Sequence, residues 1–204
     1  MKNFLLSLTA TMFLASCSMI GPKSEILHNR SDIDSKISKV IIFPTTDLSG
    51  KVSIDAKAIN PSVIAGFASI YGADKTIPAG LVIEKVTNNI GNNFYATFIA
   101  PLDNASAIEE SSKNPKVKKF VADVNNKLGN YQFVIAVLSG SQADYDSGNP
   151  VSLHLGLYDT KNTTWKLITK TSTKKMIAVK WDVASKALIA KGFSEFKKLN
   201  PTQK

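Results

Sequence analysis

The sequence has few of the residues that carry covalent or metal chemistry. Its 204 residues include one cysteine, Cys17, and two histidines, His28 and His154. A single thiol cannot form a disulfide within the chain, and the two histidines lack the spacing that is typical of a zinc site. We therefore expect no bound metal and no other cofactor.

Arginine is equally scarce. Arg30 is the only arginine among 25 basic residues. Planar, bidentate contacts to phosphates and to base edges depend on arginine more than on lysine. The composition therefore argues against nucleic acid as a partner.

Common catalytic motifs are also missing. No Gly-x-Ser-x-Gly, Gly-x-Gly-x-x-Gly or P-loop occurs. Ser139-Gly140-Ser141 follows an apolar run, where α/β proteins often bind ligands, but no His and acid follow it in a convincing order. Asp144, Asp146 and Gly148 resemble the start of a calcium loop whose register fails further on, which favours an Asx-rich turn. We predict a non-enzymatic protein without a small-molecule substrate; an enzyme with an unrecognised site is an alternative.

The N-terminus has the layout of a secretory signal. Lys2 supplies one positive charge, and an apolar run extends from Phe4 to Leu14. The run is shorter than the roughly 20 residues needed to span a bilayer, and small residues follow it. The pattern therefore predicts cleavage rather than retention as a membrane helix.

The end of this signal, Leu14-Ala15-Ser16-Cys17, resembles the bacterial lipobox. The resemblance implies cleavage between Ser16 and Cys17 and acylation of Cys17, which becomes the first residue of the mature protein. Several acyl chains would hold the protein on the membrane far more firmly than one. Ser18 stands where an Asp would retain such a protein in the inner membrane, so we expect a cell outer-membrane location, with the domain facing the periplasm. The alternative is that Cys17 is an ordinary free thiol.

Three regions follow from this pattern: a signal peptide at 1–16, a lipidated tether at 17–38, and a periplasmic α/β domain at 39–204. An apolar content of 44% is sufficient for a proper core in one domain. Charge is distributed unevenly between the parts of the mature chain. Residues 17–160 contain 13 basic and 14 acidic residues, whereas residues 161–204 contain 11 Lys and two acids.

This C-terminal excess of lysine predicts a basic contact surface. The residues concerned precede and continue along the last predicted helix: Lys174, Lys175, Lys180, Lys186 and Lys191. Candidate partners are an acidic protein domain, anionic lipid head groups and phosphate-bearing envelope polymers. The alternative is a solvated lysine-rich face without a partner.

The hydrophobic pattern predicts a mixed α/β (α+β) domain with a single mixed sheet and helices packed on it. The order is strand, helices, strand, helix, strand, hairpin, helix. The predicted strands are 40–43, 94–99, 131–138, 151–158 and 165–170, and the predicted helices are 60–71, one after Pro78 or Gly80, 115–128 and 182–199. Asn60 and Asn114 are the expected N-caps, each followed by Pro. Alternation along 151–158 predicts one buried face.

This order resembles the periplasmic α/β domain shared by curli-secretion lipoproteins, the TolB N-terminal domain and the lipoprotein activators of penicillin-binding proteins. The resemblance rests on the first apolar strand ending in Pro44, the central strand 133–138, and the strand that ends in Asp159-Thr160-Lys161 before Trp165. Asn162 or Thr163 stands where these proteins often have Gly, and the segment 52–80 is longer than in them.

The resemblance implies a TolB N-terminal-like fold and a role in the bacterial envelope. We therefore expect an outer-membrane lipoprotein that binds an envelope protein or assists assembly. One alternative, an exporter or pore subunit of the curli-secretion type, needs hairpins of about 9 to 11 alternating residues per strand. The sequence between Lys39 and Leu199 contains no such pair.

Overall fold

The computed structural model of the chain describes residues 21–31, 39–80, 83, 85 and 92–200. The predicted signal peptide, Ser16 and Cys17 lie outside these residues. Most of the helix predicted after Pro78 or Gly80 lies outside them as well.

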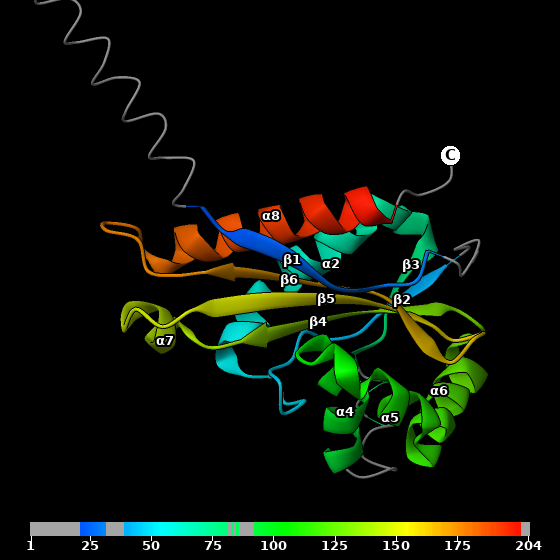
Figure 1. Cartoon of the computed structure of the whole chain (residues 1–204). Helices are drawn as coiled ribbons and strands as arrows, with labels where there is room; N and C mark the ends of the chain where they lie inside the picture. Colours follow the sequence, from blue (N-terminus) through cyan, green and yellow to red (C-terminus); the bar gives the residue numbers. More distant parts are fainter. Residues whose placement is uncertain (1–20, 32–38, 81–82, 84, 86–91, 201–204) are drawn as a thin grey trace, which may run out of the picture.

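Six strands form one mixed sheet in the order β1-β6-β5-β4-β2-β3 (Figure 1). They are β1 Lys23–Asn29, β2 Val40–Ile42, β3 Thr76–Pro78, β4 Gln132–Ser139, β5 Val151–Asp159 and β6 Thr164–Thr173. Neighbours from β1 to β4 are antiparallel, whereas β2 is parallel to both β4 and β3. The predicted single mixed sheet with packed helices is confirmed.

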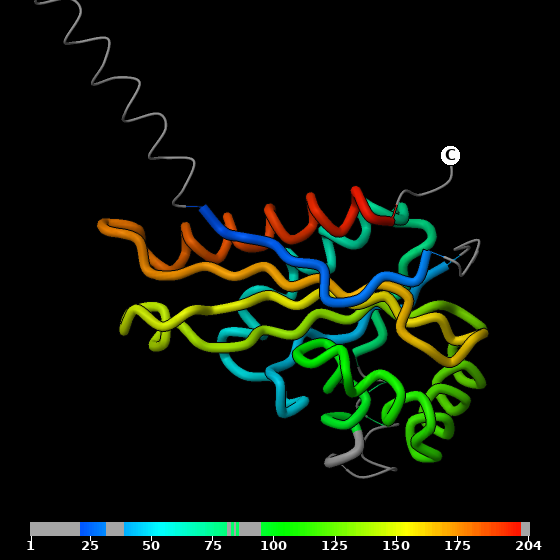
Figure 2. The backbone as a smooth tube through the Cα atoms, in the orientation of Figure 1, coloured from blue at the N-terminus to red at the C-terminus, as the bar shows by residue number. Residues whose placement is uncertain are grey.

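Helices cover both faces of the sheet (Figures 1 and 2). α2 Ile54–Tyr71 and α8 Trp181–Leu199 pack on one face, and α4 Asn92–Ile99, α5 Ile108–Lys113 and α6 Pro115–Leu128 lie on the other. Short elements complete the chain: α7 Gln142–Asp146, η1 Ala73–Lys75, η2 Ala100–Leu102 and η3 Ala105–Ala107. Because successive side chains of a strand point to opposite faces, Val40 and Ile42 enter one core cluster while Ile41 and Phe43 enter the other.

The helix 115–128 is confirmed, with the predicted caps. The Asn114 side chain accepts a hydrogen bond from the Lys116 backbone N–H at 2.9 Å. Gly129 ends the helix with a φ of 98°, a conformation that glycine adopts without steric cost. The hairpin and the last helix are confirmed too. At the hairpin turn Thr163 has a φ of 50°, which explains why glycine suits this position.

Residues 94–99 were predicted as a strand, and this prediction is wrong. They belong to α4, which continues into η2. A short apolar run is compatible with either structure, and here the deciding signal is helical spacing. Tyr95, Phe98, Ile99 and Leu102 follow one another at helical intervals and are all buried.

The predicted tether contains a strand. β1 pairs with β6 along its whole length, although 17–38 was expected to be a tether. Its local sequence is mostly polar because β1 is an edge strand. Ser24, Leu27 and His28 are half-buried, and the other residues of β1 are exposed. Its hydrogen bonds come from a partner about 140 residues away in the sequence.

The helix expected to begin at Asn60 begins earlier, and Ser53 is its N-cap. The Ser53 hydroxyl accepts from the Ala56 N–H at 3.2 Å, so Pro61 lies inside α2. Asn60 instead accepts from the backbone N–H and the hydroxyl of Thr45, at 2.9 and 3.0 Å. Its side chain therefore fixes the β2–α2 connection.

β5 was expected to bury one face but buries both. All nine of its residues are buried, because α4, η2 and α6 cover the face that carries His154 and Tyr158. Gly156 is required by this packing, since a Cβ there would collide with the Trp165 ring and with the Leu102 side chain.

Candidate interaction surface

Three of the five predicted contact lysines and the start of the described chain lie at one end of the sheet. A row of strand partners marks it: Ser139 of β4 faces Ser152 of β5, which faces Ser172 of β6, which faces Lys23 of β1. We call this the Lys23 end. α7 and the connection from β6 to α8 lie there, at the left of Figure 1.

The 174–180 loop, which joins β6 to α8, projects an isoleucine into solvent. The Val179 N–H donates to the Met176 carbonyl at 3.1 Å and closes a turn around Ile177 and Ala178. Ala178 has a φ of 62°, in the left-handed region that favours glycine. The Ile177 side chain is 100% exposed.

The hydroxyl of Tyr145 ties both sides of this turn to α7. It accepts from the Met176 N–H at 3.3 Å and donates to the Val179 carbonyl at 3.2 Å. Its ring is buried against Trp181, with 5.5 Å between the ring centroids. The loop is therefore held in place from α7 and from the start of α8.

α7 forms because of a capping box in the segment expected to be a turn. The Asp144 N–H donates to the Ser141 hydroxyl at 3.2 Å, and the Ser141 N–H donates to the Asp144 carboxylate at 2.9 Å. Hydrogen bonds from Ser141 lower the pKa of the Asp144 carboxyl. Asp144 and Ser141 thus serve local folding, and the described residues contain no group of three or more His, Cys, Asp or Glu that could hold a metal ion.

The five predicted contact lysines fall into two groups. Lys174, Lys175 and Lys180 are exposed and close together in the 174–180 loop. Lys186 and Lys191 lie further along α8, so that Lys191 is about 16 Å along the helix axis from Lys180. Lys191 is half-buried, and its Nζ lies 2.7 Å from Glu195 Oε1.

A groove with a volume of about 570 Å³ separates α7 from the 174–180 loop. Asp146 of α7, Lys175 and Lys180 of the loop, and Asp182 of α8 line the groove. The Lys175 Nζ donates to the Asp146 carbonyl at 2.5 Å. Charges of both signs line the groove, so lysine predominates only in the loop itself.

Exposed large apolar side chains gather at the same end. Ile177 is joined there by Ile54 (89% exposed), Val52 (56%) and Val183 (55%). β2 runs parallel to β4, which ends here at Ser139, so the chain that leaves β2 reaches the same end before α2 begins. The Gln142 N–H donates to the Asp55 carboxylate at 3.2 Å and links α7 to the first turn of α2. Sequence reasoning missed Ile177; the available signal was an isolated isoleucine in a lysine-rich segment without apolar periodicity.

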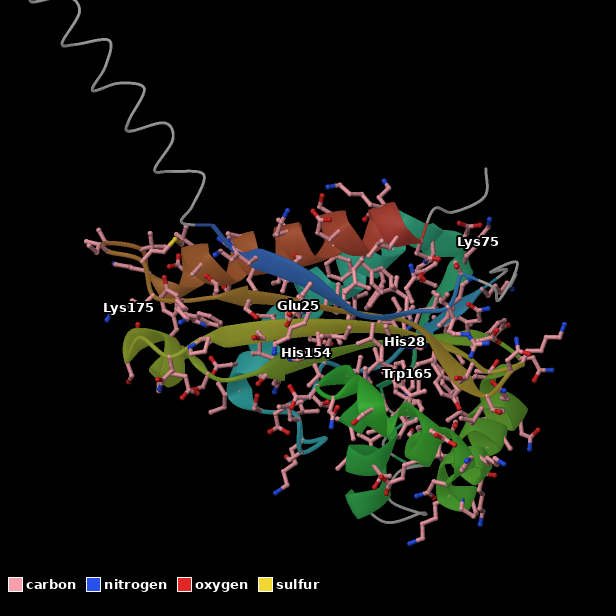
Figure 3. The ribbon with its side chains drawn as sticks, in the orientation of Figure 1. Glu25, His28, Lys75, His154, Trp165 and Lys175 are labelled. Atoms are coloured by element: carbon pink, nitrogen blue, oxygen red, sulfur yellow. The ribbon has the colours of Figure 1, made fainter. Side chains whose placement is uncertain are left out.

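The histidines lie away from this surface (Figure 3). His154 is fully buried; its Nδ1 lies 2.5 Å from the Leu102 carbonyl and its Nε2 lies 3.9 Å from Asp103 Oδ1. Burial lowers the pKa of the imidazole, against the raising effects of Leu102 and Asp103. His28 Nε2 lies 3.0 Å from the Trp165 carbonyl. The two rings therefore contact backbone at separate places.

Within the described ranges, no helix has the length and apolar character to cross a membrane. Ser16 and Cys17 lie outside those ranges, so their cleavage and acylation stay predictions.

No protein-family model matches the chain, and no curated protein matches it. Among solved structures, a point variant of PelC from Paraburkholderia phytofirmans, solved as a dodecamer, is similar with a TM-score of 0.47 and 10% identity, covering 85% of this chain and 96% of that one. A second PelC dodecamer has a TM-score of 0.45 and 11% identity, with the same coverage.

The C-terminal domain of LpoB from Escherichia coli has a TM-score of 0.35 and 10% identity, covering 70% of this chain and 87% of that one. LpoB is one of the penicillin-binding-protein activators that the sequence pattern resembles. At TM-scores below 0.5 and such low identity, these likenesses carry no functional argument.

Proposed function

We propose that this chain is a lipoprotein anchored in the outer membrane through Cys17, and that its domain binds an envelope partner or assists assembly without catalysing a reaction. The observation that carries the proposal is the Leu14-Ala15-Ser16-Cys17 sequence at the end of a secretory signal. β1 begins at Lys23, six positions after Cys17, so the folded domain follows the proposed anchor almost at once.

A binding role is supported by the chemistry of the exposed surface. The Lys23 end presents lysines, isolated apolar side chains and a charged groove in solvent. In contrast, the imidazole of His154 faces the Leu102 carbonyl inside the fold. Exposed groups of this kind suit contact with another macromolecule or a surface better than proton transfer.

The anchor is tested by following acylation in cells. With a clickable palmitate analogue, the wild-type chain should be labelled, and Cys17→Ala should not be. Globomycin should cause an uncleaved precursor to accumulate. Labelling of Cys17→Ala, or normal processing under globomycin, would contradict the lipoprotein proposal.

Sorting is tested at Ser18 in a proteobacterial host. Ser18→Asp should shift the protein towards the inner membrane in a density gradient, and the matched Ser18→Ala variant should stay in the outer membrane. Equal distributions of the two variants would contradict the outer-membrane assignment.

Partner binding is tested by photocrosslinking in intact cells. A photoreactive residue replacing the exposed Lys186 on α8 should give a discrete adduct, whereas one replacing the exposed Lys119 on α6 should not. Identical adduct patterns from the two positions would contradict a specific contact at the lysine-rich part of the domain.

A further inference from the structure

We propose that the Lys23 end of the domain rests on the membrane that holds Cys17, with Ile177 inserted at the level of anionic lipid head groups. This inference rests on the proposed acylation of Cys17. The proposed partner of the Lys23 end is a lipid membrane rather than a protein.

The segment between Cys17 and Lys23 is short, so the Lys23 end must lie close to the bilayer. Lys23 is six residues from Cys17, and six fully extended residues span about 20 Å at most. Lys23 faces Ser172 in the sheet, and the 174–180 loop begins two residues after Ser172. The β5–β6 turn lies at the opposite end of β6, about 30 Å further away (Figure 1).

The loop presents an apolar tip that is already ordered. Ile177 is 100% exposed, and the turn around it is closed by the Val179 N–H and held by the Tyr145 hydroxyl. A preformed tip loses little conformational freedom when it inserts. Val183, in the first turn of α8 and 55% exposed, adds a second apolar group near the loop.

The charges nearest to Ile177 along the chain suit an anionic surface. Residues 174–180 contain three lysines and no acid. Neither Lys174 nor Lys180 forms an ion pair with another described residue. Three acids lie nearby. Asp144 is held by the α7 capping box, and Asp182 lies in the first turn of α8, where the helix dipole favours a negative charge. Asp146 lines the groove beside Lys175, and its carboxylate accepts from the Gln142 side-chain amide at 3.5 Å.

An apolar side chain surrounded by lysines fits the boundary between head groups and acyl chains. An acidic protein would satisfy the lysines but would leave Ile177 without a defined apolar contact. The nearness of the proposed anchor, the apolar tip and the lysines therefore favour the same occupant.

The test places a fluorescent probe at the tip of the full, lipidated protein. Acylation consumes the thiol of Cys17, the only native cysteine, so Ile177→Cys provides a single site for an environment-sensitive fluorophore. The protein is reconstituted into vesicles of phosphatidylethanolamine and phosphatidylglycerol. The probe at 177 should shift its emission to the blue and be quenched by nitroxide lipids, whereas a probe on Lys161→Cys, in the β5–β6 turn, should remain in water.

Charge is tested by changing Lys174, Lys175 and Lys180 to Glu together. Each lysine near an anionic surface contributes about fivefold to the docking equilibrium constant, so the loss of three lysines should lower the ratio of docked to undocked tip on the order of a hundredfold. The matched variant changes Lys116, Lys118 and Lys119 of α6, which are also exposed, and should keep the probe at 177 docked. Vesicles of phosphatidylcholine should likewise reduce docking of the wild-type loop.

The outcomes separate the two proposals. An N-terminus without acyl chains by mass spectrometry would overturn the lipoprotein assignment itself. If the protein is acylated but the probe at 177 shows no blue shift and no nitroxide quenching on anionic vesicles, only the proposed membrane contact would be overturned. If the probe is shielded from water in intact cells but exposed to water on vesicles, the tip would be assigned to a protein partner. This result would also overturn the lipid proposal.

Discussion

The hydroxyl group of Tyr145 donates a hydrogen bond to the carbonyl oxygen of Val179 at 3.2 Å. The same hydroxyl accepts from the Met176 N–H, so one side chain of α7 holds both sides of the turn that exposes Ile177. Residues 34 positions apart in the sequence thus determine the shape of the exposed tip.

Tyr145→Phe tests this link. The variant keeps the ring that packs on Trp181 but leaves two backbone groups without their partner. We expect a loss of about 1 kcal/mol in the free energy of unfolding and faster trypsin cleavage after Lys174 and Lys175. Urea denaturation and mass-mapped proteolysis measure the two effects. Tyr131→Phe is the control, and equal cleavage in both variants would contradict the role of Tyr145.

His154 should make stability depend on pH. Burial lowers the pKa of its imidazole below the ordinary value of 6.5, so the folded protein binds this proton less readily than the unfolded chain. The free energy of unfolding should be highest above pH 6.5 and should fall as the pH drops below it, until the folded pKa is reached, by up to about 1.4 kcal/mol per pH unit.

Urea titrations between pH 8 and pH 5 measure this dependence. His154→Gln removes the titrating group while retaining a donor for the Leu102 carbonyl, so its stability should decline less over the acidic range. His28→Gln is the matched control and should keep the steeper decline. The same slope for wild type and His154→Gln would show that His154 does not contribute.

Gly156→Ala should destabilise the fold through overpacking. The new methyl group would collide with Trp165 and Leu102 in the fully covered middle of β5. Overpacking of this kind costs about 1 to 3 kcal/mol, which should lower the thermal midpoint by several degrees. Gly21→Ala is the control, because no atom lies within 4 Å of its added Cβ. A wild-type midpoint for Gly156→Ala would mean that Trp165 can move aside.

Phe120→Ala tests the packing of α6 on the sheet. Phe120 is fully buried, and its ring lies 5.4 Å from Phe98 and 5.9 Å from Phe43 between centroids. Truncation of a buried phenylalanine costs about 3 to 5 kcal/mol, a large part of a domain's total stability. The urea midpoint should fall sharply, whereas Lys119→Ala on the exposed side should leave it nearly unchanged. Similar midpoints for the two variants would contradict this placement of α6.

Elements with complete local signals could be predicted from the sequence. The helix 115–128 carries its cap, its first-turn proline, its apolar stripe and its terminal glycine within one short segment. The apolar strand that ends at Pro44 and the alternation that begins at Val151 are similarly local. The apolar patterns also predict a core, and its predicted members are all buried: Ile41, Phe43, Phe98, Phe120, Val124, Phe133, Ile135, Leu155 and Phe196.

Where local signals conflict, the sequence alone was insufficient. The segment 94–99 taken alone is compatible with a strand or a helix, and the helical spacing becomes clear only when Leu102 beyond it is included. Its burial as a helix depends on a core filled by Phe43 and Phe120 from other elements. Asn60-Pro61 has the composition of a helix start, but Ser53 caps α2 about two turns before it, and the Asn60 side chain accepts a hydrogen bond from Thr45.

Some features of the candidate surface can likewise be predicted from the sequence, whereas others depend on the tertiary structure. The sequence by itself determined the lipobox-like segment Leu14-Ala15-Ser16-Cys17, the scarcity of cysteine and arginine, and the excess of lysine near the C-terminus, because these are properties of composition and short motifs. Only the tertiary structure decided that Lys23 lies beside Ser172 and that Tyr145 supports the loop around Ile177. Strand pairing and packing join residues far apart in the chain, and local sequence carries no record of which distant partner each one meets.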